Sequence, residues 1–234
     1  MKEDGTMMRT PELMELAKKW DLKFITIKDL QAYRKQHEKL VDRVTVTKMP
    51  TKYGEFMAYG YVNRLNGEHH VALVKGDIGE GKDVLCRVHS ECLTGDVFGS
   101  LRCDCGQQFA AAMSQIEQEG RGILLYMRQE GRGIGLINKL RAYELQEQGM
   151  DTVDANLALG FPEDSRDYTC GIQILQYLGI KKVRLMTNNP KKIDAFSREN
   201  SPVEVCERVP VSMAPQLHDE FYLKTKAVRM GHLL

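Results

Sequence analysis

Hydrophobic and polar positions follow two different rhythms along this chain. In its first half, apolar residues alternate with polar ones in four short runs that are separated by turn residues, at 43–49, 55–65, 69–75 and 83–89. Alternation with a period of two is typical of strands that bury one face. These runs are therefore predicted to form a mostly antiparallel β meander.

After residue 106 the apolar positions recur mostly at helical spacing, with short strand-like runs between the helices. Helices are expected at 107–120, 136–149, 168–179, 191–200 and 218–234, and strands at 122–127 and 181–187. Helices that alternate with strands favour parallel pairing. The predicted fold class is α/β with a mixed sheet, in which an antiparallel β meander is followed by α/β layers.

Residues 1–40 differ from the rest of the chain. A helix with Pro in its first turn is predicted at 11–20, a strand at 22–27 and a second helix at 28–40. One strand between two helices has no sheet to join. We therefore predict two domains, with residues 1–40 as the end of another domain plus a linker and residues 41–234 as the main domain.

Charge and hydropathy exclude several classes of partner. Lys and Arg number 33 against 32 for Asp and Glu, so the formal net charge is +1. This balance provides neither a basic field for nucleic acid nor a polybasic patch for a membrane. No apolar run resembles a signal peptide or approaches the ~20 residues of a membrane span. We expect a cytoplasmic protein, in which clustered cysteines are more often metal ligands or catalytic groups than disulfides.

Three cysteines, Cys92, Cys103 and Cys105, are close together in the segment "ECLTGDVFGSLRCDCGQQ". A structural zinc site normally has four protein ligands, whereas a catalytic site has three and leaves one position to water. The spacing does not match a zinc finger, and only His89 could supply a nearby fourth ligand. Three thiolates around a catalytic zinc that activates water is the preferred hypothesis, and a structural site that includes His89 stays open.

Two other segments could bind an anion, and a third has a plain structural interpretation. The loop "RQEGRGIG" at 128–135 offers Arg side chains and close backbone approach, although Gly-rich turns are common. In "MTNNPKK", Pro190 suits a first helical turn, which places Lys191 and Lys192 against the helix dipole unless an anion offsets them. They could equally be solvated. In "FPEDSRDY", Asp164 and Arg166 could be an N-cap and a surface residue.

Other motifs and residues are interpreted as structural, with no role in a functional site. "HSE" at 89–91 is half of a zinc deaminase pattern whose second half is missing, and "GDIGEGKD" at 76–83 is interpreted as a hairpin turn rather than a P-loop. The histidines, His232 included, are predicted to be structural or solvated. The remaining cysteines, Cys86, Cys170 and Cys206, are expected to be buried.

Four of these segments together resemble a known family. "RVHSECLTGDVFGSLRCDCG", "LLYMRQEGRGIGLINKLRAY", "DTVDANLALGF" and "LMTNNPKK" are similar to GTP cyclohydrolase II, an enzyme of riboflavin biosynthesis, and the likeness extends over roughly 41–234. Residues 3–34 resemble the C-terminal end of 3,4-dihydroxy-2-butanone 4-phosphate synthase. The metal-binding motifs of that synthase are missing, so no synthase activity is expected.

The resemblance implies roles for individual residues. It implies that zinc is held by Cys92, Cys103 and Cys105. It implies Asp164 as general base, Arg166 as nucleophile toward the α-phosphate, and Tyr143 near the purine. It implies that GTP contacts Arg87, Val88, His89, Ser90, Glu91, Gln108, Glu130, Gly131, Arg132, Thr152, Thr187 and Lys192.

The implied reaction converts GTP and water to 2,5-diamino-6-ribosylamino-4(3H)-pyrimidinone 5′-phosphate, formate and pyrophosphate. The family implies a catalytic Zn²⁺, Mg²⁺ on the GTP phosphates, and a homodimer. Because guanidinium stays protonated in proteins, an electrostatic clamp is a simpler role for Arg166 than a covalent one. Two alternatives remain: a silent nucleotide-binding or regulatory module of the same fold, and a deaminase that would release ammonia.

Overall fold

The computed structural model describes residues 1–2, 4–198, 201–211, 213 and 219–233. It divides into two compact units, Met1–Lys39 and Leu40–Leu234. The predicted helix ends at 199–200, 218 and 234 lie outside the described residues. Within the described ranges, every helix is too short or too polar to cross a lipid bilayer.

The first unit contains two helices, α1 (Thr10–Lys19) and α2 (Ile27–His37). The strand predicted at 22–27 is wrong, because residues 22–26 belong to no helix or strand and Ile27 is the first residue of α2. Thr26 begins the helix with a capping box: its Oγ1 accepts from Asp29 N, and its own N donates to Asp29 Oδ2, both at 3.0 Å. Two local patterns compete here. The apolar run at 22–27 favours a strand, whereas the T-x-x-D pattern of Thr26 and Asp29 favours the beginning of a helix.

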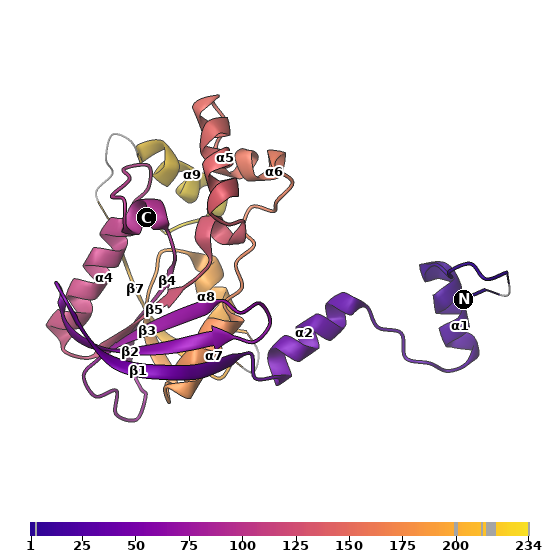
Figure 1. The fold of residues 1–234 in the computed structure, drawn as a ribbon, viewed down its shortest axis with the longest axis horizontal. Coiled ribbons are helices and arrows are strands. Elements are labelled where there is room, and N and C mark those ends of the chain that lie inside the picture. Colours follow the sequence, from indigo (N-terminus) through magenta and orange to yellow (C-terminus); the bar gives the residue numbers. More distant parts are fainter. Residues whose placement is uncertain (3, 199–200, 212, 214–218, 234) are drawn as a thin grey trace. The chain divides into compact units, whose positions relative to one another are not determined.

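The second unit is built on one seven-stranded sheet of order β1-β2-β3-β5-β4-β6-β7 (Figure 1). The strands are β1 (Val41–Thr51), β2 (Gly54–Asn63), β3 (His69–Lys75), β4 (Val84–Ser90), β5 (Gly122–Met127), β6 (Lys182–Met186) and β7 (Glu204–Val209). The first three form an antiparallel meander, whereas β4 pairs in parallel with β5 and β6, and β6 in parallel with β7. The mixed α/β sheet that the pattern predicts is confirmed.

The hairpin predicted at 76–83 is wrong, because β5 lies between β3 and β4 in the sheet. The glycines of this connection have a packing role. A Cβ on Gly76 would meet the carbonyl oxygen of Gly120, and one on Gly81 would meet that of Gly179. Their φ angles of +66° and +72° are also in the left-handed region. The segment therefore follows the surface of two helix ends and has no P-loop geometry.

The remaining elements are α3 (Leu93–Asp96), α4 (Cys105–Glu119), a 3₁₀ turn η1 (Glu130–Gly133), α5 (Leu136–Glu147), α6 (Thr152–Ala158), α7 (Thr169–Tyr177), α8 (Pro190–Phe196) and α9 (Glu220–Met230). The short helices α3 and α6 and the strand β7 were not predicted from the sequence. Pro190 is in the first turn of α8, as its position in the sequence predicts.

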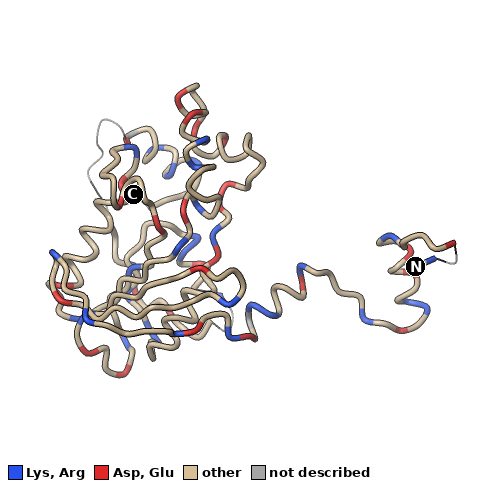
Figure 2. The backbone as a smooth tube through the Cα atoms, viewed as in Figure 1, with Lys and Arg blue, Asp and Glu red and all other residues tan. Residues whose placement is uncertain are grey.

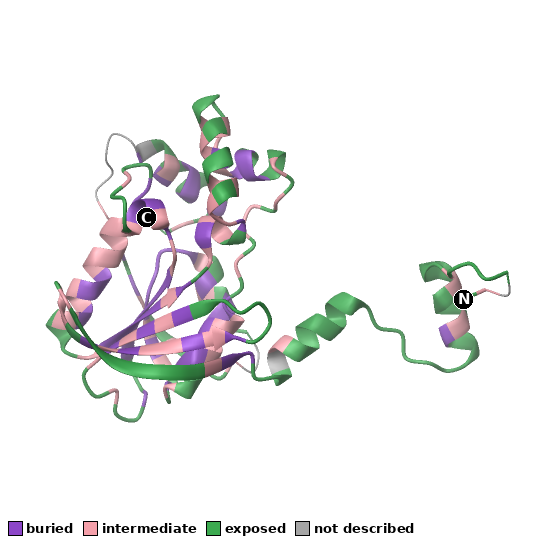
Figure 3. Cartoon of the chain, in the orientation of Figure 1, coloured by how far each residue is buried: buried purple, intermediate pink, exposed green. Residues whose placement is uncertain are grey.

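Alternating residues of the central strands pack on opposite faces of the sheet. Val84, Cys86 and Val88 contribute to a core that includes residues of α7 and α8, while Leu85 packs in a second core with residues of α4. Both faces are thus covered, and the central strands are buried along their length (Figure 3). Two core clusters of this size make the second unit the larger source of hydrophobic stability.

Two of the expected cysteine environments need comment. Cys86 is fully buried, but Cys170 is only partly buried against the core and Cys206 is exposed, so the prediction holds in part for Cys170 and is wrong for Cys206. Strand β7 is the last strand of the sheet, and half of its residues, Cys206 among them, are exposed. The apolar pattern around Cys206 therefore belongs to an edge strand, and not to a buried one. Lys, Arg, Asp and Glu are interspersed over the second unit (Figure 2), as the near-zero net charge suggests.

Candidate active site

The predicted site residues gather where the parallel strands β4, β5 and β6 end. The carboxyl ends of parallel strands meet at one edge of a sheet, and open α/β sheets commonly bind ligands there. All predicted site residues except Val88 and Asp164 line one pocket at this edge. Val88 is buried in the core, and Asp164 lies behind Arg166 as its partner.

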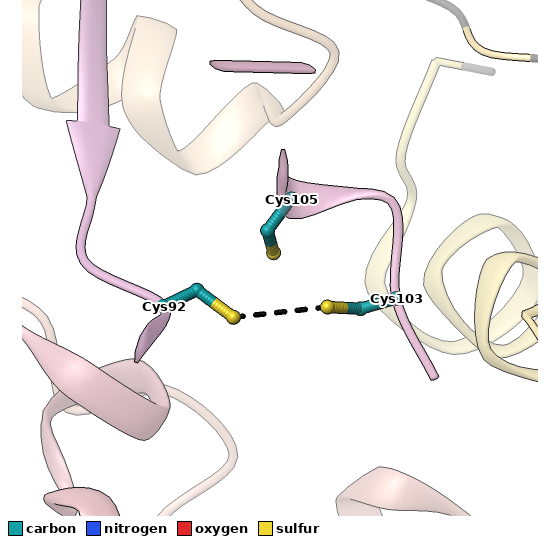
Figure 4. A group of neighbouring side chains, drawn as sticks. All are labelled: Cys92, Cys103 and Cys105. Atoms are coloured by element: carbon teal, nitrogen blue, oxygen red, sulfur yellow. Dashed lines mark hydrogen bonds between the residues drawn. The ribbon is translucent and has the colours of Figure 1, made fainter. Parts of the chain in front are cut away.

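Three thiols face one another in this pocket. Cys92 lies two residues after β4, at the N-cap of α3, while Cys103 lies just before α4 and Cys105 is the first residue of α4 (Figure 4). The Sγ atoms of Cys92 and Cys103 are 3.7 Å apart, and all three sulfurs lie within 4.8 Å of one another. A tetrahedral zinc with Zn–S bonds of about 2.3 Å would separate its sulfurs by about 3.8 Å. The donor set therefore fits a zinc ion.

The group of potential metal ligands comprises these three cysteines alone, within the part of the chain that the structure describes. His89, the candidate fourth ligand, turns its Nε2 to the carboxylate of Asp96 at 3.0 Å. Its ring is buried and packs against Phe109 and Tyr126. This arrangement favours three protein ligands over the closed site that includes His89.

A cation that sequence reasoning did not select, Lys139 of α5, lies beside the thiols. Its Nζ lies 3.1 Å from Cys92 Sγ, 2.9 Å from Thr94 Oγ1 and 2.8 Å from Glu130 Oε1. Burial alone would lower the pKa of Lys139, but the Cys92 thiolate and the Glu130 carboxylate outweigh burial and raise it. Hydrogen bonds from Cys103 and Cys105, together with the Lys139 ammonium, hold the pKa of Cys92 far below its usual value. The pocket therefore favours a thiolate, the form that binds metal.

Two glycines allow the two cysteine-containing segments to lie close to each other. A Cβ on Gly95 would lie 3.1 Å from the sulfurs of both Cys92 and Cys103, and one on Gly106 would meet the carbonyl oxygen of Gly95. Neither glycine has a positive φ. Space, and not backbone conformation, therefore requires glycine at these two positions.

We expect Gly95→Ala to weaken zinc binding by roughly tenfold to a hundredfold, since forcing a methyl into a packed site costs about 1–3 kcal/mol. Competition with a chromogenic chelator measures the affinity. Gly171→Ala is the control, because its Cβ would meet Leu125 at 3.3 Å, away from the thiols. Unchanged zinc affinity in Gly95→Ala would contradict the packing described here.

The loop after β5 presents Arg132 to the pocket. Gly131 and Arg132 both have left-handed backbone conformations, with φ of 62° and 60°. A non-glycine residue there is strained, and such strain is often found at functional sites. Both terminal nitrogens of Arg132 are buried and lack a hydrogen-bond partner among the described residues. The anion cradle predicted at 128–135 thus contains a guanidinium with free donors.

Two more cations of the pocket have backbone or amide partners in place of carboxylates. Arg87 donates to Met186 O at 2.7 Å and to Gln108 Oε1 at 2.5 Å, and Lys192 Nζ donates to Val88 O at 2.6 Å. Burial, and then the positive charge of Arg87 and of Arg166, hold the pKa of Lys192 well below its usual value. A bound anion would oppose both effects.

Lys191 differs from its neighbour. It is exposed and pairs with Glu163 at 2.8 Å, as the solvated alternative predicts.

Asp164 and Arg166 form a pair with two hydrogen bonds. Arg166 Nε donates to Asp164 Oδ1 at 2.8 Å, and Nη2 donates to Oδ2 at 2.5 Å. Burial alone would raise the pKa of Asp164, but the hydrogen bonds from Arg166 outweigh it and lower the pKa. Helix α7 has Tyr168 as its N-cap, so the N-cap interpretation of Asp164 is wrong. The pair holds the Arg166 guanidinium at the pocket wall.

The other predicted residues surround this charged region. Glu91 accepts from Arg128 Nε at 2.7 Å, and Glu130 Oε2 accepts from Leu93 N at 2.6 Å, which joins the loop after β5 to the loop after β4. Tyr143 lies beside the thiols, with its hydroxyl 3.4 Å from Thr94 Oγ1, and burial raises its pKa to about 12. Further wall residues are Ser90, Thr152 and Thr187.

Sequence reasoning missed part of the wall. Lys139 and the C-terminal residues Tyr222, Lys226 and His232 line the same pocket. Lys139 lies in the segment "LINKLRAY", whose helical spacing located the helix but not the direction of the side chain. The C-terminal residues have no local motif, because their positions depend on long-range packing.

Comparisons with known proteins agree with this geometry. Residues 42–210 match the family model of GTP cyclohydrolase II, and residues 1–33 match that of 3,4-dihydroxy-2-butanone 4-phosphate synthase. The chain is 60% identical over 232 residues to riboflavin biosynthesis protein RibBA of Bacillus mycoides strain KBAB4, which covers 99% of this chain and 58% of the relative. RibBA of Bacillus cytotoxicus is 58% identical over 234 residues, covering 100% of this chain and 58% of that protein.

The chain thus spans a little over half the length of these two relatives. Among solved structures, a two-domain 3,4-dihydroxy-2-butanone 4-phosphate synthase, RibBX, from A. baumannii is similar at a TM-score of 0.49. It is 29% identical and covers 88% of this chain and 52% of that one. The family match extends over most of the second unit, including the three cysteines and the loop at 128–135. This chain belongs to the GTP cyclohydrolase II family.

Proposed function

We propose that the second unit hydrolyses GTP to 2,5-diamino-6-ribosylamino-4(3H)-pyrimidinone 5′-phosphate, formate and pyrophosphate, as a step of riboflavin biosynthesis. One observation supports this most: a group of three cysteines lines the same pocket as three cations that have no carboxylate partner among the described residues. The thiolates suit a metal that acts on the purine ring, and the cations suit a polyphosphate. One molecule that needs both is a purine nucleoside triphosphate.

Cys92, Cys103 and Cys105 would hold the zinc. A zinc ion with three protein ligands supplies Lewis-acid activation of water, which suits hydrolysis at C8 of guanine and release of formate. Tyr143 is positioned beside the thiols, and with a pKa of about 12 its phenol keeps its proton at neutral pH. It can therefore donate a hydrogen bond to the ring as charge develops. Lys139 balances the negative charge of the thiolates.

Arg132, Arg87 and Lys192 would bind the triphosphate. A triphosphate carries more charge than these three cations neutralise, so we propose that Mg²⁺ accompanies the phosphates. Arg132 is best suited to bidentate contact, because both terminal nitrogens are free to donate. His89, Ser90 and Thr187 would add polar contacts from the strand ends.

Arg166 would contact the α-phosphate as an electrostatic clamp. Burial alone would lower its pKa, but the charge of Tyr168 and Asp164 keeps the pKa raised above the usual value. A guanidinium in that state has no lone pair with which to attack phosphorus. Asp164, expected as general base, has both carboxylate oxygens occupied by Arg166, so we propose that it mainly orients the guanidinium.

The test is to incubate the protein with GTP and Mg²⁺ and to assay formate and pyrophosphate together. We expect both products in equal amounts. Pyrophosphate alone would contradict the role of the thiolate site in ring opening. Ammonia in place of formate would support a deaminase, and binding of GTP without any product would support a silent nucleotide-binding module.

We further propose that residues 1–40 are dispensable for this reaction and that the second unit acts as a homodimer in the cytoplasm. The pocket is lined entirely by residues of the second unit. Limited proteolysis near Arg43 should therefore leave the rate of formate release unchanged. Light scattering of the same sample measures the oligomeric state, and a monomer with full activity would contradict the dimer.

A further inference from the structure

The last helix and the residues after it form one wall of the pocket. Tyr222, Lys226 and His232 line it, although the family match ends at residue 210. These residues have therefore received no role from the comparisons. Their positions raise the question of what they contact when a ligand is bound.

Lys226 attaches α9 to the thiolate segment. Its Nζ lies 2.7 Å from Oδ1 of Asp104, and both side chains are buried. Asp104 lies between Cys103 and Cys105 and also accepts from Gln108 Nε2 at 2.5 Å. A buried ion pair with this additional hydrogen bond is a fixed contact and costs much to break. The position of α9 is thus determined at the metal end of the pocket.

After α9 the chain turns back toward the residues that follow β6. Gly231 ends α9 with a left-handed φ of 64°, and His232 N donates to Lys226 O at 3.1 Å. Leu233 N donates to Asn188 O at 2.9 Å, next to Thr187 and close in sequence to Lys192. His232 is therefore held by backbone hydrogen bonds on both sides.

The His232 ring has an unused polar atom. Its Nε2 is buried and has no hydrogen-bond partner within the described ranges. Burial and the charges of Lys226, Arg166, Arg132 and Lys192 lower the pKa of His232 to about 3. The ring is therefore neutral at neutral pH and adds no repulsion among four cations. A neutral donor surrounded by cations is suited to an anion that the cations also attract.

We propose that His232 is a substrate-binding residue whose Nε2–H donates a hydrogen bond to a phosphate oxygen of the bound nucleotide. The C-terminal segment from Tyr222 to Leu233 thereby completes the pocket, with Lys226 as a positioning residue that acts through Asp104. This inference rests on the proposed function, because a purine nucleoside triphosphate is taken as the ligand. The shared chemistry is that of a polyphosphate beside Arg132 and Lys192.

The test compares His232→Ala and His232→Gln with the wild type, all loaded with zinc. Calorimetric titration with inorganic pyrophosphate in Mg²⁺ reports the phosphate contact, and titration with guanosine reports the rest of the pocket. We expect His232→Ala to weaken pyrophosphate binding and to raise the KM for GTP, each about tenfold, because a hydrogen bond to a charged group is lost. Guanosine affinity should not change, and His232→Gln should recover most of the loss because it keeps an N–H donor.

His69→Ala is the matched control, since His69 is exposed on β3 and does not line the pocket. It should behave as the wild type does. Pyrophosphate affinity and KM that are unchanged in His232→Ala would overturn the inference. An equal loss of guanosine and pyrophosphate affinity would also overturn it, because that pattern indicates displacement of the whole segment.

The two proposals fail in different ways. If the wild type releases no formate from GTP, the proposed function fails, while the pyrophosphate titrations still decide the role of His232. If the wild type is active and His232→Ala matches it in every measurement, only the inference about His232 fails.

Discussion

Replacing Cys105 by Ser is expected to reduce formate release from GTP by at least about a thousandfold while the chain stays folded. A catalytic metal supplies several kcal/mol of transition-state stabilisation, and about 4 kcal/mol corresponds to this factor. The fold should persist because α4 is held by Ala112, Met113 and Ile116 in a core that does not include the thiol. Formate assay, zinc content and thermal melting of the same preparation measure the three quantities.

Cys206→Ser is the control for this variant. Cys206 is exposed on the edge strand β7, away from the pocket, so its replacement should leave activity, zinc content and melting temperature unchanged. If Cys105→Ser unfolds instead, the three thiolates form a structural site. If it keeps full formate release, the thiolates have no part in the reaction.

Arg166→Met is expected to reduce pyrophosphate release by about a hundredfold to a thousandfold, whereas Arg166→Lys should stay within about tenfold of the wild type. Loss of one preorganised hydrogen-bond donor to a charge that develops in the transition state typically reduces the rate by about a hundredfold to a thousandfold, which is the effect expected for Arg166→Met. Lysine keeps the positive charge but not the two hydrogen bonds to Asp164, so part of the positioning is lost. Rapid-quench measurement of pyrophosphate in a single turnover reports this step.

The same experiment separates the clamp from a covalent role. A covalent nucleophile would form a phospho-arginine adduct, and Arg166→Lys would then lose as much activity as Arg166→Met. Intact-protein mass spectrometry of quenched wild-type samples would detect such an adduct. An electrostatic clamp predicts that no mass increase appears at any time point.

Local signals predicted much of the site. Two cysteines separated by one residue at the beginning of a helix indicated a metal group, because short spacing constrains where the side chains can lie. Pro190 located the beginning of α8, since proline is favoured in a first helical turn. The glycines of "RQEGRGIG" indicated a loop with close backbone approach, and all three of them have positive φ. Each of these depends on neighbours within a few residues.

Long-range features were not predictable in this way. Strand β5 lies between β3 and β4 although it follows both in sequence, and no pattern in the run at 69–89 indicates that order. The salt bridge from Lys226 to Asp104 joins residues 122 positions apart. Such contacts depend on the packing of the whole unit. The family resemblance identified some site residues that the local patterns could not, but it gave no role to Lys139 or to His232.

The residues from 1 to 39 show a competition between two local signals. The apolar run at 22–27 favours a strand, whereas Thr26 and Asp29 favour a helix cap. The cap prevails because a lone strand has no partner for its backbone groups, while the capping box satisfies two of them at once. A cap signal next to an isolated apolar run is thus the stronger indication.

In the proposed function, one zinc ion held by Cys92, Cys103 and Cys105 makes this pocket competent to release formate from GTP. The most direct measurement is a zinc titration of the metal-stripped protein with GTP and Mg²⁺ present, with formate as the readout. We expect no formate before zinc is added and a linear rise that ends at one zinc per chain. Formate release that is complete without zinc would contradict the proposed function, and so would release that fails to rise when zinc binds.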